Sequence, residues 1–397
     1  MGLNETVSAE RTHIAFFGLR NAGKSSIVNA ITGQELSIVS DVKGTTTDPV
    51  RKAMELFPLG PVVIIDTPGL DDEGKLGEQR VRKALEILAK TDIAVLVVDS
   101  VRGEGKLDRE LIEAFEKKRL PYFVVYNKSD ISLKRKETKK NEIYASALTG
   151  ENIDLLKTML GDAAKHNTTA SKLVSDLIDK NDLVLLVIPI DESAPKGRLI
   201  LPQQQTMRDI LDIGGSFVAC RETEVKRTLS GLKKKPKLVI TDSQVFGKVS
   251  EDTPIDVMLT SFSILFARYK GELKALAEGA KALSALKDGD RVLISEGCTH
   301  HRQCNDIGSV KMPGWIEKYT NSKPQYEFTS GGDFPADLSE YKLIVHCGGC
   351  MLNEKEMKNR IQRAEEAGVP IVNYGVAIAQ MHGILERSLE PFKAELN

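Results

Sequence analysis

The sequence predicts an α/β fold in which a P-loop domain is followed by two smaller α/β domains. The chain has 397 residues, which is more than one ordinary hydrophobic core accommodates. Between residues 13 and 165, nearly continuous apolar runs alternate with helical periodicity, a pattern typical of buried parallel strands joined by helices. A glycine-rich phosphate-binding motif stands between the first apolar run and the first helix. Together these observations predict a doubly wound sheet whose ligand site lies at the carboxyl ends of the strands.

A polar stretch at residues 165–171 predicts the first domain boundary. The domains are therefore expected at residues 1–168, 169–268 and 269–397. The second domain contains no catalytic motif, and its apolar segments suit a dimer interface. The elements expected along the chain are strands at 13–17, 62–65, 93–98, 122–126, 183–190, 216–222, 237–241, 291–294 and 341–345 and helices near 203–212, 272–286 and 353–367.

Composition and charge argue against several classes of protein. Apolar residues make up 41% of the chain and charged residues 28%, as in globular rather than disordered proteins. Because 55 basic and 56 acidic residues leave a net charge of −1, we expect neither nucleic acid nor a membrane surface as a partner. Residues 1–12 lack the apolar core of a signal peptide, and the apolar run at 182–190 is much shorter than the ~20 residues that cross a bilayer. We therefore expect a cytoplasmic protein.

Residues 18–25, Gly-Leu-Arg-Asn-Ala-Gly-Lys-Ser, match the GxxxxGKS motif of nucleotide-binding loops. Such a loop binds phosphate because its backbone N–H groups and the start of the following helix point at the phosphate oxygens. Lys24 is expected to reach the β- and γ-phosphates, and the hydroxyl of Ser25 is expected to bind Mg²⁺. The residues expected to contact the nucleotide here are Gly18, Asn21, Ala22, Gly23, Lys24, Ser25 and Ser26.

The next motif, Asp66-Thr-Pro-Gly69, ends the expected strand at 62–65. Its carboxylate is placed to hold Mg²⁺ through water, and the backbone N–H of Gly69 can meet a γ-phosphate. This motif therefore completes the phosphate side of the predicted site.

A third motif, Asn127-Lys128-Ser-Asp130, predicts the choice of base. Asp130 can accept two hydrogen bonds that guanine donates and adenine cannot, while Asn127 would hold the loop together. Ser146 and Ala147 follow at the expected distance, and their backbone could contact the guanine oxygen. The predicted ligand is GTP.

Residues 13–165 resemble the TrmE/Era-like branch of the translation-factor-related GTPases, which implies a P-loop GTPase domain that converts GTP to GDP and phosphate. In this branch a switch threonine lies in a Gly-Thr-Thr context, as in Gly-Thr-Thr-Thr-Asp at 44–48, and Thr46 is taken as a Mg²⁺ ligand over its two neighbours. Lys24, Thr46 and Gly69 are then the residues expected to act during hydrolysis.

Two residues bear on how hydrolysis proceeds. Leu70 stands where Ras-like enzymes have the glutamine that orients the attacking water, and an apolar side chain cannot do so. Asn21 matches the asparagine that helps hold K⁺ against the phosphates in potassium-activated members of the branch. The resemblance therefore implies hydrolysis that K⁺ stimulates, because the ion would supply the positive charge that an arginine supplies elsewhere.

Cysteine and histidine crowd the last quarter of the chain. Cys298-Thr-His300 follows one expected strand, and His346-Cys-Gly-Gly-Cys350 follows another. Two neighbouring strand ends bring their following loops into one crevice, so Cys298, Cys347 and Cys350 could meet at one metal centre. Three thiolates suit an iron–sulfur cluster with one open iron, whereas a Cys₂His₂ or Cys₃His zinc site uses the same residue types. The spacing alone leaves both open.

A TrmE/Era-like domain followed by CxH and then HCxxC resembles the maturation GTPases of iron–iron (FeFe) hydrogenases, the HydF family. This resemblance runs over the whole chain and implies a homodimer with GTPase, dimerisation and iron–sulfur cluster-binding domains. It implies a 4Fe-4S cluster on Cys298, Cys347 and Cys350. His300 and His346 are candidates for the fourth ligand or for residues that hydrogen-bond to a ligand. The implied role is a scaffold or carrier that delivers a di-iron precursor to apo-FeFe-hydrogenase, with the radical-SAM maturases as further partners.

A second class of function stays open at this point. Many TrmE/Era-like GTPases act in RNA modification or ribosome assembly, and a structural zinc site would then account for the cysteines. The near-neutral charge and the lack of a KH-type Gly-X-X-Gly loop in a basic setting count against an RNA partner. Colour distinguishes the two metals, because a protein with an iron–sulfur cluster is brown and a zinc protein is colourless.

Overall fold

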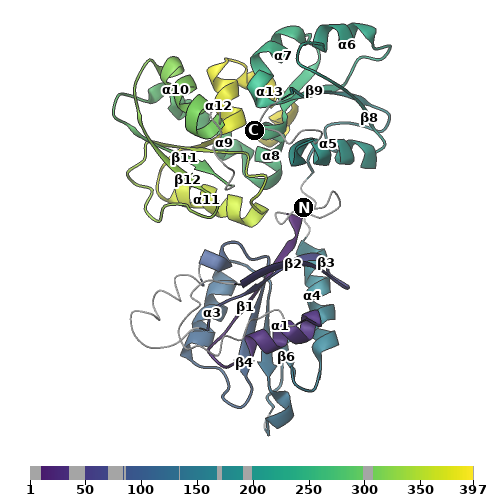
Figure 1. The fold of residues 1–397 in the computed structure, drawn as a ribbon, viewed down its shortest axis with the longest axis vertical. Coiled ribbons are helices and arrows are strands. Elements are labelled where there is room, and N and C mark those ends of the chain that lie inside the picture. Colours follow the sequence, from purple (N-terminus) through teal and green to yellow (C-terminus); the bar gives the residue numbers. More distant parts are fainter. Residues whose placement is uncertain are drawn as a thin grey trace. The chain divides into compact units, whose positions relative to one another are not determined.

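The computed structural model describes residues 10–34, 50–69, 84, 86–133, 135–167, 172–190, 199–297 and 307–396. The chain forms two compact units, residues 1–170 and residues 171–397. Figure 1 shows the two units with their elements labelled. In the part of the chain that is described, no helix combines the length and the apolar character needed to cross a membrane.

The first unit contains one sheet with the strand order β2-β3-β1-β4-β5-β6. Strand β2 runs antiparallel to β3, and the other neighbours are parallel. Its strands are β1 (Thr12–Phe17), β2 (Val50–Leu56), β3 (Gly60–Asp66), β4 (Ile93–Asp99), β5 (Tyr122–Asn127) and β6 (Glu142–Tyr144). Its described helices are α1 (Lys24–Thr32), α3 (Lys106–Lys117), α4 (Ile153–Asn167) and the short turn η2 (Ser129–Ile131).

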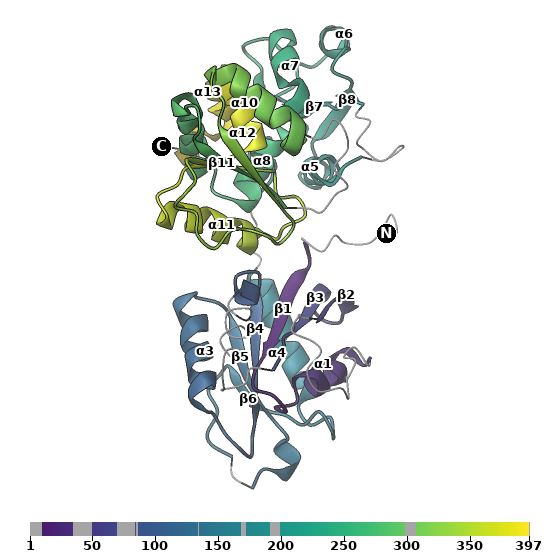
Figure 2. The ribbon, with the colours of Figure 1, turned by 60° about the vertical axis from the view of Figure 1, so that its left-hand side comes forward.

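Helices cover both faces of this sheet, with α3 on one face and α1 and α4 on the other (Figures 1 and 2). Successive residues of a strand point to opposite faces, so Ile14 and Phe16 join the core beneath α1 and α4. Ala15 and Phe17 join the core beneath α3. Burial on both faces explains why the sequence of β1 is apolar without alternation.

The parallel register brings the carboxyl ends of the central strands to one edge of the sheet. Phe16 on β1 lies beside Asp66 at the end of β3, and Asp99 at the end of β4 lies beside Asn127 at the end of β5. The loops that carry the nucleotide motifs therefore start next to one another, as a doubly wound sheet requires.

The second unit contains two parallel four-stranded sheets, ordered β10-β9-β7-β8 and β12-β11-β13-β14. Their strands are β7 (Leu183–Val187), β8 (Ser216–Cys220), β9 (Leu238–Thr241), β10 (Met258–Ser261), β11 (Arg291–Glu296), β12 (Gln325–Ser330), β13 (Leu343–His346) and β14 (Ile371–Asn373). The longer helices are α5 (Leu201–Asp212), α6 (Val225–Gly231), α7 (Phe246–Asp252), α8 (Phe262–Lys270), α9 (Leu273–Ala280), α10 (Met312–Thr320), α11 (Glu354–Glu366) and α12 (Tyr374–Met381). The shorter helical segments are η3 (Ser243–Val245), η4 (Lys281–Ala285), η5 (Ile307–Lys311), α13 (Leu385–Leu389), η6 (Glu390–Phe392) and α14 (Lys393–Leu396).

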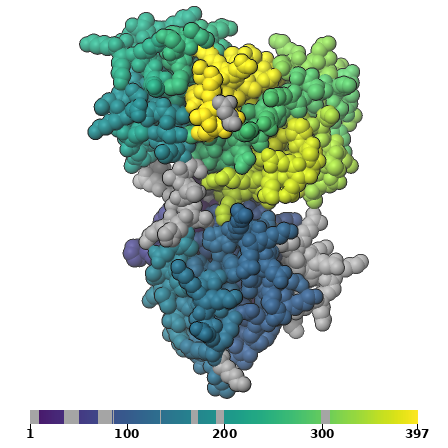
Figure 3. Space-filling view, turned by 180° about the vertical axis from the view of Figure 1, so that it is seen from behind, coloured from purple at the N-terminus to yellow at the C-terminus, as the bar shows by residue number. Residues whose placement is uncertain are grey.

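One continuous hydrophobic core joins the two sheets of the second unit. Helix α12 packs against α8, and α13 packs against β10, so the C-terminal segment lies against the first sheet of this unit (Figure 3). The boundary expected between residues 268 and 269 falls inside α8, whose N-terminus is capped by the hydroxyl of Ser261, which accepts the N–H of Ile264 at 3.3 Å. The predicted α/β class is confirmed, and the described residues form three sheets.

Candidate nucleotide site and cysteine loop

Two glycines allow the phosphate-binding loop to turn between β1 and α1. Gly18 has φ +141°, and a Cβ there would lie 2.2 Å from the carbonyl oxygen of Val97 on β4. Gly23 has φ +87°, and a Cβ there would lie 2.1 Å from Nδ2 of Asn127. A residue with a side chain would clash at either position, so the GxxxxG spacing follows from these two close approaches.

Lys24 is the first residue of α1, and its side chain is buried. Its ammonium donates hydrogen bonds to the carbonyl oxygens of Leu19 at 2.9 Å and Gly18 at 3.1 Å. The positive charge therefore lies within the turn of the loop, where the helix N-terminus also favours an anion.

Ser25 and Asp66 meet beside this loop. The Ser25 hydroxyl donates to Oδ2 of Asp66 at 2.7 Å, while Oδ1 of Asp66 is buried and accepts no hydrogen bond from the described residues. Burial raises the pKa of Asp66, whereas the Ser25 hydrogen bond and the charge of Lys24 lower it. A hydroxyl next to a carboxylate oxygen with unused lone pairs is a donor set that fits Mg²⁺.

The Asp66–Gly69 loop lies against the phosphate-binding loop. The hydroxyl of Thr67 donates to the carbonyl oxygen of Phe16 at 2.7 Å. A Cβ on Gly69 would lie 2.9 Å from Cα of Arg20, so only glycine permits this close approach of the two backbones. Ser26 is an exposed residue of α1, whereas Thr46 and Leu70 lie outside the described residues.

Asn127 connects three loops of the site. Its Nδ2 donates to the carbonyl oxygen of Ala22 at 3.0 Å, and its Oδ1 accepts the N–H of Ala147 at 3.2 Å. The Asn127 side chain is buried, and its hydrogen bond to Ala22 is made away from water. Asn127 therefore ties the phosphate-binding loop to the Ser146–Ala147 loop, which are more than 120 positions apart in the sequence.

The loop after β5 has supports that the sequence motifs do not include. The hydroxyl of Ser129 donates to Glu151 at 2.6 Å, and Arg135 donates to the same carboxylate at 2.9 Å and to the carbonyl oxygen of Ser129 at 3.1 Å. Lys128, with φ +65°, places its ammonium 2.6 Å from Oδ2 of Asp99. Asp130 is exposed, so its carboxylate is open to a ligand.

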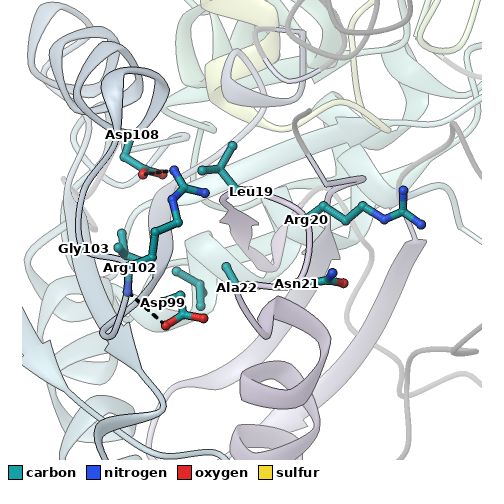
Figure 4. A pocket seen from close by; sticks show the side chains of 10 residues that line it. Leu19, Arg20, Asn21, Ala22, Asp99, Arg102, Gly103 and Asp108 are labelled. Carbon is teal, nitrogen blue, oxygen red and sulfur yellow. Dashed lines mark hydrogen bonds and ion pairs between the residues drawn. The ribbon is translucent and has the colours of Figure 1, made fainter. Parts of the chain in front are cut away.

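A cavity of about 200 Å³ lies between the phosphate-binding loop and the connection from β4 to α3 (Figure 4). Figure 4 shows Asp99, Arg102 and Asp108 on one side of it, with the side chains of Arg20 and Asn21 directed away from them. Asn21 is exposed and has φ +62°, a conformation that asparagine tolerates better than most residues.

Substituting Gly23 with alanine should test the close approach to Asn127. Because the added Cβ would overlap Nδ2 of Asn127, we expect the Asn127 hydrogen bonds to break and guanine-nucleotide affinity to fall by at least about tenfold. Gly33→Ala is the matched control, since Gly33 also has positive φ, at +64°, but a Cβ there meets nothing within 4 Å. The control should lose about 1–2 kcal/mol of stability from backbone strain and keep its affinity, as measured by thermal unfolding and nucleotide titration. Equal affinity losses in both variants would contradict the role of Asn127.

In the second unit, β11 and β13 are neighbours, and Ser295 lies beside His346 in the register. The loops that follow them therefore start side by side. Sγ of Cys347 accepts the N–H of Gly297 at 3.0 Å and that of Gly349 at 3.4 Å. The loop from residue 347 to residue 352, called the CxxC loop below, turns at Gly349, where φ is +63°.

Gly297, whose N–H donates to the Cys347 sulfur, is the residue that directly precedes Cys298 in the sequence. Cys298 and His300 themselves lie outside the described residues. Within the described part of the chain, no group of three or more His, Cys, Asp or Glu side chains is placed to hold a metal ion. Cys220 lies on β8 in the other sheet of the unit.

Both ring nitrogens of His346 are engaged within the protein. Nδ1 lies 2.7 Å from the carbonyl oxygen of Cys347 and so donates to it, and Nε2 accepts from Arg360 at 3.0 Å. Burial and the nearby charge of Arg360 lower the pKa of His346 to about 3, so the ring is neutral. In this arrangement His346 can affect a metal centre only through the backbone of Cys347.

Arg360 is itself buried, and four partners hold it. It donates to His346, to Ser295 at 3.3 Å, to Glu356 at 2.8 Å and to the carbonyl oxygen of Gly331 at 2.7 Å. These contacts fix the orientation of the His346 ring. Arg360 belongs to no sequence motif, and α11 brings it to His346 at the end of β13 only in the folded unit.

Three family models match the chain in succession. Residues 13–128 match the 50S ribosome-binding GTPase model. Residues 173–271 match the Hydrogen maturase F dimerization domain, and residues 274–391 match the Hydrogen maturase F tetramerization domain. The two maturase models together cover more than half of the chain. The chain belongs to the hydrogen maturase F family.

Membership of the hydrogen maturase F family confirms the predicted relationship and the predicted order of a P-loop GTPase domain and two further α/β domains. A homo-oligomer is supported by both maturase models. The third domain is expected from the sequence to bind a cluster, and the family model that matches residues 274–391 describes it as a tetramerization domain, which the sequence did not predict.

The GTPase domain has curated relatives outside the hydrogen maturase F family. The tRNA modification GTPase MnmE of Nitrosomonas europaea is 35% identical over 156 residues, which are 38% of this chain and 34% of the relative. GTPase Era of Clostridium botulinum is 30% identical over 169 residues, which are 38% of this chain and 57% of the relative. The chain thus spans about a third of the length of the MnmE relative and somewhat over half of Era.

Solved structures give weaker similarities. Era of Aquifex aeolicus, crystallised with GDP·AlF₄⁻, covers 80% of this chain and 92% of its own at 17% identity and a TM-score of 0.34. A probable GTP-binding protein engB covers 39% of this chain and 100% of its own at 23% identity and a TM-score of 0.33. Scores this low carry no argument about this chain.

Proposed function

We propose that the chain is a GTP hydrolase that carries a 4Fe-4S cluster and serves as scaffold or carrier for a di-iron precursor of the FeFe-hydrogenase active site. The observation that carries this proposal is the approach of the segment before Cys298 to the sulfur of Cys347, in a member of a hydrogenase maturase family. Apo-FeFe-hydrogenase and radical-SAM maturases are the proposed partners, and the cytoplasm is the proposed compartment.

The nucleotide site supports the GTP half of the proposal. Lys24 would meet the phosphates, Ser25 and Asp66 would hold Mg²⁺, and Asp130 would accept hydrogen bonds from guanine. Mg²⁺ would neutralise charge on the phosphates. Asn127 would keep the phosphate and base sides of the site in register through its two hydrogen bonds.

The cysteine loop supports the cluster half. Cys347 and Cys350 stand on either side of a glycine turn, and two backbone N–H groups already point at the Cys347 sulfur, an arrangement that favours a thiolate there. Cys298, Cys347 and Cys350 would hold three irons. Since both nitrogens of His346 are engaged, we propose that His346 orients the Cys347 backbone and that His300 is the better candidate for the fourth iron.

Anaerobic reconstitution with iron and sulfide tests the proposed function. We expect a brown protein with about four irons per chain and an electron paramagnetic resonance signal after reduction. Because a non-cysteine ligand binds iron less firmly, added imidazole should change that signal. A colourless protein that binds zinc and takes up no iron would contradict the cluster and support the structural zinc alternative.

Potassium should accelerate hydrolysis and sodium should not. Asn21 is exposed at the turn of the phosphate-binding loop, where its side chain could hold a cation against the phosphates. The cation would stabilise the negative charge that develops on the phosphates in the transition state, so we expect kcat to rise at least about tenfold. Asn21→Ala should remove the potassium response while GTP binding persists, and Asn29→Ala, in the second half of α1, is the control. Equal rates in KCl and NaCl would remove the argument from Asn21.

A further inference from the structure

Lys270 is a buried lysine that the nucleotide and cysteine motifs do not include. It is the last residue of α8, its side chain is 2% exposed, and α8 packs against α11 and α12. Lysine is seldom buried, because its ammonium loses its hydration and must be compensated by hydrogen bonds within the protein. The partners of this ammonium therefore indicate what the residue does.

The Lys270 ammonium donates to one loop. Its Nζ lies 2.9 Å from the carbonyl oxygen of Cys350, 2.9 Å from that of Leu352 and 3.5 Å from that of Gly349. All three carbonyls belong to the CxxC loop. An ammonium has three N–H donors, so this geometry directs its hydrogen bonds to the backbone that carries the second thiol of the motif.

The hydrogen bonds of Lys270 connect the segments that match the two maturase models. Lys270 lies in the segment that matches the dimerization domain, residues 173–271, and the CxxC loop lies in the segment that matches the tetramerization domain, residues 274–391. Gly271 follows directly, and a Cβ there would lie 2.8 Å from the carbonyl oxygen of Ala267 and 3.0 Å from Cδ1 of Ile361. The C-terminal end of α8 therefore packs closely against α11, which contains Ile361.

The buried charge of Lys270 would also act on the proposed iron–sulfur cluster, which is anionic. The Lys270 ammonium lies 2.9 Å from the carbonyl oxygen of Cys350, whose thiolate is one of the proposed cluster ligands. A 4Fe-4S cluster held by thiolates is anionic and gains one more negative charge on reduction. Because charges interact strongly where water is excluded, a nearby ammonium stabilises the reduced form more than the oxidised form.

We propose that Lys270 is a positioning residue of the cluster site, which holds the CxxC loop in place from the dimerization segment and raises the reduction potential of the cluster by its buried charge. The second part of this inference rests on the proposed cluster function, and the first part does not.

Amide hydrogen exchange on the full-length protein without metal tests the positioning role. Lys270→Met should speed exchange in peptides covering the CxxC loop by about tenfold or more, because the loop loses hydrogen bonds to a charged group. Arg387→Met is the matched control, since Arg387 donates to the backbone carbonyls of Ser250, Thr253 and Pro254. It should speed exchange near residues 250–254 and leave the CxxC loop protected. Unchanged exchange in the CxxC loop of the Lys270→Met protein would overturn the positioning role.

Redox titration of the reconstituted protein tests the charge. Lys270→Gln keeps two N–H donors but no charge, so it should fold even if the methionine variant does not, and its potential should shift to more negative values. Lys270→Arg keeps the charge and should keep the potential near that of the wild type. Equal potentials in the wild type and the glutamine variant would overturn the electrostatic role. A wild-type protein that takes up no cluster would contradict the proposed function, while the exchange experiment would still decide whether Lys270 holds the loop.

Discussion

Replacing Cys347 with serine is expected to abolish or strongly degrade the iron–sulfur cluster while GTP hydrolysis continues. Two backbone N–H groups point at the Cys347 sulfur, and a serine hydroxyl does not supply the thiolate that iron–sulfur clusters require. The remaining two cysteines, Cys298 and Cys350, are too few to hold the cluster. Iron content and the resonance signal after reconstitution measure the loss.

Hydrolysis should survive because the GTPase domain belongs to a separate compact unit with its own cores. Cys220→Ser is the control, since Cys220 lies on β8 in the other sheet of the second unit and should leave the cluster intact. A cluster that persists in the Cys347→Ser protein would refute the assigned ligand set. Loss of GTPase activity together with the cluster would contradict the independence of the two units.

Replacing Asp130 with asparagine is expected to weaken GTP binding about ten- to hundredfold. The exposed carboxylate can accept two hydrogen bonds from guanine, and charge-assisted hydrogen bonds of this kind contribute roughly 1.5–3 kcal/mol. The same substitution should improve binding of xanthine nucleotides, whose additional oxygen can accept a hydrogen bond from the amide. Titration with GTP, XTP and ATP measures the change.

Asp154→Asn is the matched control, because Asp154 has an exposed side chain in the first turn of α4 and pairs with Lys157. It should bind GTP as the wild type does. Equal binding of ATP and GTP by the wild type would show that the base assignment is wrong.

The strands that are buried on both faces were the most predictable elements. The run expected at 93–98 is β4, Ile93–Asp99, and the run expected at 122–126 is β5, Tyr122–Asn127. Among the edge strands, the one expected at 216–222 is β8, Ser216–Cys220, whereas others were missed. Strands β2 and β12 lie at the edges of their sheets, and β12, Gln-Tyr-Glu-Phe-Thr-Ser, is only partly buried. Both of these missed strands carry several polar residues, so their composition alone did not separate them from loops.

Parts of the candidate site were predictable because each motif is local. The phosphate-binding loop, the Asp66–Gly69 loop and the Asn127–Asp130 loop each place a required residue type within a few positions of a strand end. The supports of those loops were not predictable. Arg135, Glu151 and Arg360 belong to common residue types at unremarkable positions, and their roles follow from partners that the fold brings to them.

By itself, the sequence determined the P-loop GTPase domain, its motifs and the kinship with hydrogenase maturases, because backbone conformation at a glycine turn and the chemistry of a side chain are local properties. Only the tertiary structure decided that Asn127 joins Ala22 to Ala147, that the ring of His346 is occupied by Arg360, and that Lys270 reaches the CxxC loop. These contacts join residues that lie far apart in the chain or on different elements, and a buried polar group takes whichever partner the packing of those elements supplies.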